Sequence, residues 1–207
     1  MARRPRLDSE AARRLLDVSR ETWTPLERYI ALLERWQPRI NLVARRSLDD
    51  LWRRHVLDSA QLARHRERLA SPWYDLGSGA GFPGLVLVLL GLGQVRLVES
   101  DRRKAAFLAE AARLSDAAAV VLNQRIEALP KTDAATITAR ALAPLPRLLA
   151  LAAPLLTAET ELWLWKGQDV EVELTNAARC WNMRVERYRS ISDPTGTILH
   201  LTEVSRA

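Results

Sequence analysis

The chain has 207 residues, 48% of them hydrophobic, with a single cysteine and a net charge of +6. This length allows one α/β core with an appendage and is too short for two full enzymatic domains. The longest apolar run is Leu85 to Leu90, and Met1 to Pro5 carries no apolar stretch, so we expect no membrane span, no secretion signal and a cytoplasmic location.

The first third of the chain is predicted to form a basic helical cap. Residues 1–71 hold 16 Arg and 10 acidic residues, whereas residues 72–207 hold 15 Arg plus Lys and 15 acidic residues. Thr24 to Glu27 combines a capping box with a proline at the first helical position, which predicts a helix that ends at Pro38. A second helix is expected to start at Ser47. We interpret residues 1–71 as a cap that faces RNA, although solvated helix faces would carry the same charge.

From Trp73 onward, short apolar runs alternate with helical stretches, a pattern typical of βα units and a mostly parallel sheet. Strands are expected at 73–76, 95–99, 119–123, 135–139 and 161–165, and helices at 83–91, 102–115, 144–156 and 169–180. A turn-rich link between residues 183–191 and 197–204 predicts a terminal antiparallel hairpin. The expected fold is a seven-stranded, Rossmann-like α/β domain over residues 72–207.

A glycine-rich loop, Asp75 to Gly84, follows the first predicted strand and leads into a helix. A nucleotide-like ligand meets a helix N-terminus at such a turn. Gly77, Gly79 and Gly81 allow the backbone to approach that ligand closely. Glu99 ends the next predicted strand, 22 residues after Gly77, where a carboxylate can accept both hydroxyls of a ribose. The pattern therefore predicts an adenosine site.

The glycines alone do not separate S-adenosylmethionine from a nicotinamide dinucleotide. Asp75 favours S-adenosylmethionine, because its carboxylate suits a cationic amino acid end and would repel a pyrophosphate. Phe82 is expected to close over this donor, or to pack beneath the following helix. Ile126 and Glu127, past the third strand, are expected to flank the adenine. Arg140, at the end of the fourth strand, is placed to reach the methionine carboxylate or an RNA phosphate.

The region after the fourth strand restricts the methyl acceptor. It reads Thr138 to Ala141 and lacks the Asn/Asp-Pro-Pro-aromatic pattern common in methylation of exocyclic amines. Methylation of a pyrimidine C5 needs a thiolate, and we expect Cys180 to be a small core residue of a helix. Guanine N7 carries an exposed lone pair that can attack a sulfonium methyl directly, without a general base. Arg140 is then the catalytic candidate, through alignment of donor and acceptor.

Several polar residues are candidates for contact with RNA. Arg residues of the cap can grip phosphate, although each alone is more often solvated. His55, Asp58 and Ser59 share a helix face and form either a polar cluster at the site mouth or a buried helix lock. They are too few to predict a metal site. The RNA-binding candidates are Arg45, Arg46, Arg53, Arg54, His55 and Lys166.

Seven short motifs occur along residues 25 to 191, in an order and spacing that match a known family. They are Asn41-Leu42, His55 to Ser59, the Asp75 to Gly84 loop, Lys104 to Leu108, Arg125 to Glu127, Ala139 to Ala141 and Lys166-Gly167. In them the chain resembles the ribosomal small-subunit methyltransferase G family, also called glucose-inhibited division protein B. The resemblance implies a class I S-adenosylmethionine-dependent fold and methyl transfer to N7 of one guanine in 16S rRNA. It also implies S-adenosylhomocysteine as product, no metal, and a monomer that binds 16S rRNA or the small ribosomal subunit.

Other functions stay open at this point. A small-molecule methyltransferase or a nicotinamide-dependent reductase would require a bulky apolar substrate lid, which the basic first third argues against. A methyltransferase of another RNA would share the same cofactor site. A non-catalytic ribosome assembly factor would bind the cofactor without turnover.

Overall fold

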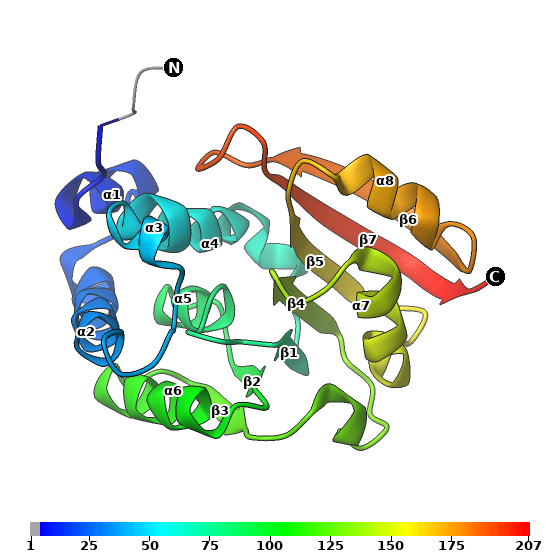
Figure 1. Ribbon diagram of the computed structural model, residues 1–207, viewed down its shortest axis with the longest axis horizontal. Coiled ribbons are helices and arrows are strands. Elements are labelled where there is room, and N and C mark those ends of the chain that lie inside the picture. Colours follow the sequence, from blue (N-terminus) through cyan, green and yellow to red (C-terminus); the bar gives the residue numbers. More distant parts are fainter. Residues whose placement is uncertain (1–4) are drawn as a thin grey trace.

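The computed structural model describes residues 5–207, which form one seven-stranded sheet with helices on both faces (Figure 1). Residues 1–4, part of the segment expected to lack a secretion signal, lie outside the described residues. The strands are β1 Trp73–Leu76, β2 Val95–Val98, β3 Ala119–Leu122, β4 Thr136–Arg140, β5 Glu161–Lys166, β6 Trp181–Arg189 and β7 Thr197–Arg206. Their order is β3-β2-β1-β4-β5-β7-β6.

The first five strands pair in parallel, and β7 runs antiparallel to both β5 and β6. The expected seven strands and terminal hairpin are therefore confirmed. The order of the strands reverses at β1, which lies between β2 and β4. Ligands of open α/β sheets bind beyond the carboxyl ends of the strands at such a reversal. The topology thus places a site beside the loop that follows β1.

Helices cover the sheet in two layers, with α2, α5 and α6 on one face and α7 and α8 on the other (Figure 1). Their bounds are α1 Ser9–Leu16, α2 Arg20–Trp36, α3 Arg45–Leu48, η1 Trp52–Leu57, α4 Asp58–Ala60, η2 Gln61–Arg68, α5 Gly84–Leu89, α6 Arg102–Leu114, η3 Ile126–Ala128, α7 Leu145–Ala152, η4 Ala153–Leu155 and α8 Val170–Ala177. No helix within residues 5–207 is long and apolar enough to cross a membrane.

Two helix starts expected in the cap are wrong. The helix expected from Thr24 begins at Arg20, because the Ser19 hydroxyl accepts a hydrogen bond from the amide of Thr22. Pro25 therefore lies inside α2. Ser47 is not a cap either, since it lies within α3 and its hydroxyl donates to the main-chain oxygen of Ala44. In both cases the residue that was expected to cap the helix does not cap it.

The cap and the sheet share one hydrophobic core. Trp23 and Leu62 of the cap are fully buried in the same cluster as Leu85 of α5 and Phe107 of α6. The Tyr29 hydroxyl also donates to a main-chain oxygen of the glycine loop across 2.6 Å. The cap is consequently packed directly above the loop where the cofactor is expected.

Cys180 corrects one expectation. The sequence predicted a small core residue in a helix that runs to residue 180, but α8 ends at Ala177 and Cys180 is exposed. The last helical turn is replaced by a tight turn into β6, in which the Cys180 amide donates to the main-chain oxygen of Ala177. This places the thiol at the end of the sheet away from the glycine loop.

Candidate functional site

A cavity of about 1170 Å³ opens at the carboxyl ends of the parallel strands. Its floor is formed by the loops that follow β1 to β5, and its roof by α3, η1 and the turn between β6 and β7. Seven of the nine candidate cofactor residues line it, and they are Gly77, Gly79, Phe82, Glu99, Ile126, Glu127 and Arg140. Asp75 and Gly81 do not line it. The position matches the site expected for a doubly wound sheet.

The glycine loop is shaped so that side chains are excluded from the floor. Gly77 has φ +66°, and a Cβ there would lie 2.5 Å from Cδ1 of Leu142. Gly79 has φ +56°, and its amide donates to Oε2 of Glu99 across 2.8 Å. Residues other than glycine rarely adopt this backbone conformation. The loop therefore leaves room for a ligand to contact its main chain.

Glu99 is positioned to hold a ribose. Its Oε1 accepts the amide of Asp101 at 2.7 Å, its Oε2 accepts the Gly79 amide, and the residue is 8% exposed. Each carboxylate oxygen has a second lone pair and can accept one more hydrogen bond, and Glu99 lines the cavity. The cavity between this carboxylate and the glycine loop thus fits the adenosine part of S-adenosylmethionine, with Ile126 and Glu127 in η3 at its edge.

Asp75 does not reach this cavity, contrary to the expectation that it holds the amino group of the cofactor. The carboxylate lies behind the glycine loop and is 1% exposed. Its Oδ1 accepts the Thr138 hydroxyl at 2.7 Å, while Oδ2 has no hydrogen-bond partner within the described chain. Burial raises the pKa of Asp75 to about 6. Gly84 packs directly against this side chain, since a Cβ at Gly84 would lie 2.9 Å from Cγ of Asp75.

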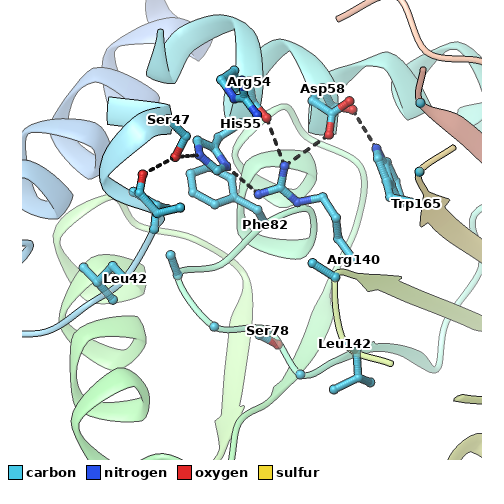
Figure 2. Close-up of a pocket in the computed structure, with 18 of the residues that line it drawn as sticks. Leu42, Ser47, Arg54, His55, Asp58, Ser78, Phe82, Arg140, Leu142 and Trp165 are labelled. Carbon is cyan, nitrogen blue, oxygen red and sulfur yellow. Dashed lines mark hydrogen bonds and ion pairs between the residues drawn. The ribbon is translucent and has the colours of Figure 1, made fainter. Parts of the chain in front are cut away.

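Arg140 extends from the end of β4 up to the helical cap (Figure 2). Its Nη1 donates to the main-chain oxygen of Arg54 at 3.0 Å and to Oδ2 of Asp58 at 3.1 Å. Its Nη2 is 2.6 Å from Nδ1 of His55. The guanidinium lines the cavity, and these contacts fix it in one orientation at the junction of sheet and cap.

The contacts of His55 assign its tautomer. The ring is buried, and Nε2 lies 2.8 Å from the Ser47 hydroxyl, which itself donates to the main-chain oxygen of Ala44. Because Arg140 can only donate, Nδ1 must accept and Nε2 must carry the proton. Burial first, and then the charges of Arg140 and Arg54, lower the pKa of His55 to about 3. A neutral His55 therefore orients Arg140, and the contact with RNA expected for His55 stays a prediction.

Phe82 packs between the glycine loop and the cap. Its ring centroid is 4.9 Å from that of His55, and the Arg140 guanidinium lies 5.1 Å from the ring centre. The side chain is 4% exposed. Phe82 therefore packs under the cap residues that hold Arg140 and also lines the cavity, so its closure over the donor stays a prediction.

Asp58 joins three parts of the site. In addition to Arg140, its carboxylate accepts the hydroxyls of Ser190 and Ser192 from the turn between β6 and β7. The Trp165 indole nitrogen of β5 donates to the main-chain oxygen of Asp58 at 2.9 Å (Figure 2). The sequence indicated a polar cluster at the site mouth but not these partners, because the serines lie more than 130 positions further along the chain.

Ser59, the third member of the expected cluster, locks the helix and does not face the site mouth. Its hydroxyl donates to the main-chain oxygen of His55 at 2.7 Å, inside the helix, and the residue is fully buried. The cluster is therefore divided, with His55 and Asp58 directed to Arg140 and Ser59 locking the helix.

The candidate RNA-binding arginines differ in exposure, ion pairing and distance from the cavity. Arg46 and Arg54 are exposed at the cavity mouth and form no ion pair within residues 5–207. Arg53 also lines the cavity but pairs with Asp50, and Arg45 is exposed outside it. Sequence reasoning did not select four further cations of the cavity lining, which are Arg6, Lys104, Arg125 and Arg147, and of these Arg6 pairs with Asp49.

Lys166 is not placed to grip a phosphate at the surface. Its side chain is 6% exposed, and Nζ donates to the main-chain oxygen of Ala143 and to Oε2 of Glu173, both at 2.8 Å. The ammonium therefore lies at the base of the site, between the loop after β4 and helix α8. Within residues 5–207, no group of three or more His, Cys, Asp or Glu could hold a metal ion.

Comparison with known proteins agrees with this geometry. The family model described as rRNA small subunit methyltransferase G matches residues 23–201. The chain is 55% identical to the ribosomal RNA small subunit methyltransferase G of Rhodospirillum rubrum over 92% of this chain and 94% of that protein. It is 46% identical to the protein of the same name from Gluconobacter oxydans over 91% of this chain and 97% of that protein.

Solved structures with the same fold are more distant in sequence. The glycopeptide N-methyltransferase MtfA, complexed with S-adenosyl-L-homocysteine, superposes with a TM-score of 0.60 at 10% identity, over 72% of this chain and 89% of that chain. A mutant of MtNAS in complex with S-adenosylmethionine gives 0.59 at 16% identity, over 95% and 84%. These likenesses confirm the expected Rossmann-like class I methyltransferase fold.

Proposed function

From the premise that this chain belongs to the rRNA small subunit methyltransferase G family, we propose that it methylates N7 of one guanine in 16S rRNA. The donor is S-adenosylmethionine, which supplies a methyl group on a cationic sulfur, and the product is S-adenosylhomocysteine. The observation that carries the proposal is the cavity that Glu99 and the glycine loop share with the cap. A cofactor on this floor has its reactive end open to a substrate that enters beneath the cap.

The residues of the site perform binding and alignment. Glu99 accepts the ribose hydroxyls, and the main chain at Gly77 and Gly79 allows close approach of the donor. Arg140, held by His55 and Asp58, presents a fixed positive edge beside the donor. Guanine N7 has a free lone pair and loses no proton during attack, so no general base is required. Alignment of donor and acceptor then accounts for the rate.

The basic cap supports RNA as the substrate. Arg46 and Arg54 lie at the cavity mouth, where a phosphate backbone would pass while the target base enters the site. Lys104, Arg125 and Arg147 add positive charge on the sheet side of the same mouth. We include in the proposal a division at residue 72 into an RNA-facing cap and a methyltransferase domain, action as a cytoplasmic monomer, and independence from metal.

The experiment that tests the proposal is transfer of labelled methyl from S-adenosylmethionine to purified small ribosomal subunits that lack the modification. Nucleoside analysis of the RNA is expected to show the label as 7-methylguanosine at a single site, with or without a chelator. Label on another nucleoside would overturn the choice of acceptor. Cofactor binding without any label would favour an assembly factor that binds S-adenosylmethionine as a ligand.

A further inference from the structure

A side pocket of about 250 Å³ adjoins the main cavity at the carboxyl ends of β4 and β5. The two hollows share part of their lining, which consists of Ala141, Leu142, Trp165, Lys166 and Gly167. The two hollows therefore lie next to each other, separated by side chains that line both. A water molecule occupies about 30 Å³ of the liquid, so the pocket has room for a ring system and not only for a bridging water.

The walls of the pocket are apolar and one end is charged. Leu142, Pro144, Leu148 and Trp165 form the sides, together with small alanine side chains. Lys166 and Glu173 provide the charged end. Flat apolar walls with a few convergent polar groups are typical of sites for planar ligands. Such a pocket suits a base that has left its stack.

The carboxylate at this end has one oxygen in use and one available. Oε2 of Glu173 accepts from the Leu145 amide at 2.6 Å and from Nζ of Lys166 at 2.8 Å. Within the described part of the chain, Oε1 accepts no hydrogen bond. Lys166 uses two of its three protons, on Ala143 and Glu173, which leaves one donor. The charged end of the pocket thus offers an acceptor, Oε1 of Glu173, beside a donor, Nζ of Lys166.

We propose that this pocket receives the target guanine and that Glu173 reads its Watson–Crick edge, an inference that rests on the proposed function. Guanine presents N1–H and the N2 amino group on that edge, and the two lone pairs of Oε1 can accept one hydrogen bond from each. The remaining Lys166 proton meets O6, which lies next to N1. Adenine has an unprotonated N1 at the same position, so it would place a lone pair against the carboxylate and be rejected.

This orientation also accounts for the atom that is methylated. N7 lies on the opposite edge of the purine from the N2 amino group. When the Watson–Crick edge is held at Glu173, N7 points back toward Leu142, which contacts Gly77 of the cofactor loop. A single carboxylate would therefore select both the base and the reacting nitrogen.

The simpler interpretation is that Lys166 and Glu173 only fasten α8 to the loop after β4. The two interpretations differ in their response to the N2 amino group, which inosine lacks. Small subunits are assembled with 16S rRNA that carries either guanine or inosine at the target position, and kcat/KM for labelled methyl transfer is measured on both. We expect the wild-type protein to prefer guanine about 10- to 100-fold, the ratio for one hydrogen bond to a charged group.

The variant Glu173→Gln keeps the shape of the side chain, and its carbonyl oxygen can still accept from Leu145 and Lys166. At the position of Oε1, however, it carries an amide NH2 that donates and cannot accept. We expect kcat/KM on guanine to fall by about 10- to 100-fold and the preference over inosine to disappear. Glu171→Gln, on the same helix but paired with Arg187 at the surface, is the matched control and should keep both values.

Equal use of guanine and inosine by the wild-type protein would overturn the pocket while leaving the proposed function intact, and this measurement requires no variant. Preserved discrimination in Glu173→Gln would do the same, since a merely structural role slows both substrates alike. Absence of 7-methylguanosine on guanine subunits would instead refute the proposed function itself.

Discussion

Nη2 of Arg140 donates to Nδ1 of His55 across 2.6 Å, and this contact links the end of β4 to the helical cap. It requires a neutral imidazole, because a protonated ring would present N–H to a guanidinium that can only donate. The floor of the cavity and the cap are thus joined through a hydrogen bond that protonation of one residue, His55, removes.

The first prediction concerns stability against pH. The pKa of His55 is about 3 in the folded protein and near its ordinary value of 6.5 when the chain is unfolded. Between these values the unfolded chain binds the proton more readily than the folded protein does. The contribution of His55 to the free energy of unfolding is therefore complete above pH 6.5 and decreases as pH falls toward 3. We expect the free energy of unfolding to fall by about 1 kcal/mol per pH unit more steeply than in His55→Gln between pH 6 and 4. Denaturant titrations across this range measure the difference, and parallel curves would contradict it.

The second prediction concerns the coupling of Asp58 and Arg140, whose side chains are 13% and 16% exposed. Removal of one member of a mostly buried ion pair leaves an uncompensated charge. We expect Asp58→Ala and Arg140→Ala each to lower the free energy of unfolding by about 3 kcal/mol, and the double variant to lose less than the sum.

Asp58→Ala should also raise KM for small subunits, because Arg140 and the β6–β7 turn lose their fixed orientation. Arg140→Ala should reduce methylation to background while the far-UV spectrum keeps its helical signal. Additive losses of stability would contradict the coupling, and retained turnover in Arg140→Ala would remove that residue from the active site.

The third prediction concerns the cofactor. In Glu99→Gln, one of the two oxygens that could each accept a ribose hydroxyl becomes an amide nitrogen that can only donate. We expect the Kd for S-adenosylmethionine to rise about 10- to 100-fold by titration calorimetry, the ratio for a hydrogen bond to a charged group. Glu159→Gln, an exposed residue outside the cavity, is the matched control. An unchanged Kd for Glu99→Gln would place the ribose elsewhere.

The fourth prediction concerns the cap arginines. Arg46 and Arg54 are exposed at the cavity mouth, so replacement of both by Gln should raise KM for small subunits and leave the Kd for the cofactor unchanged. The slope of log KM against log salt should fall by about one for each RNA phosphate that the variant no longer neutralises. Arg35→Gln, at an exposed position of α2 away from the cavity, should change neither quantity. An equal effect of Arg35→Gln would indicate that only net charge matters.

Local patterns were sufficient to predict the sheet and the cofactor floor. The alternation of apolar runs and helical stretches determined the seven strands, since each pattern reports the periodicity of its own backbone. Gly77, Gly79 and Glu99 were likewise identified from spacing, because the turn and the next strand are close in the chain. Helix starts were less predictable, as Ser19 shows, because several serines and threonines compete to cap one helix.

The sequence by itself determined the family, the fold and the glycine loop that lines the cavity, all of which depend on neighbours along the chain. Only the tertiary structure decided where the charged side chains point. Asp75 lies behind its loop, Lys166 lies at the base of the site, and Arg140 is held by residues of the cap more than 80 positions away. The physical reason is that the pairing and burial of a charge depend on groups brought together by folding, which no local pattern records.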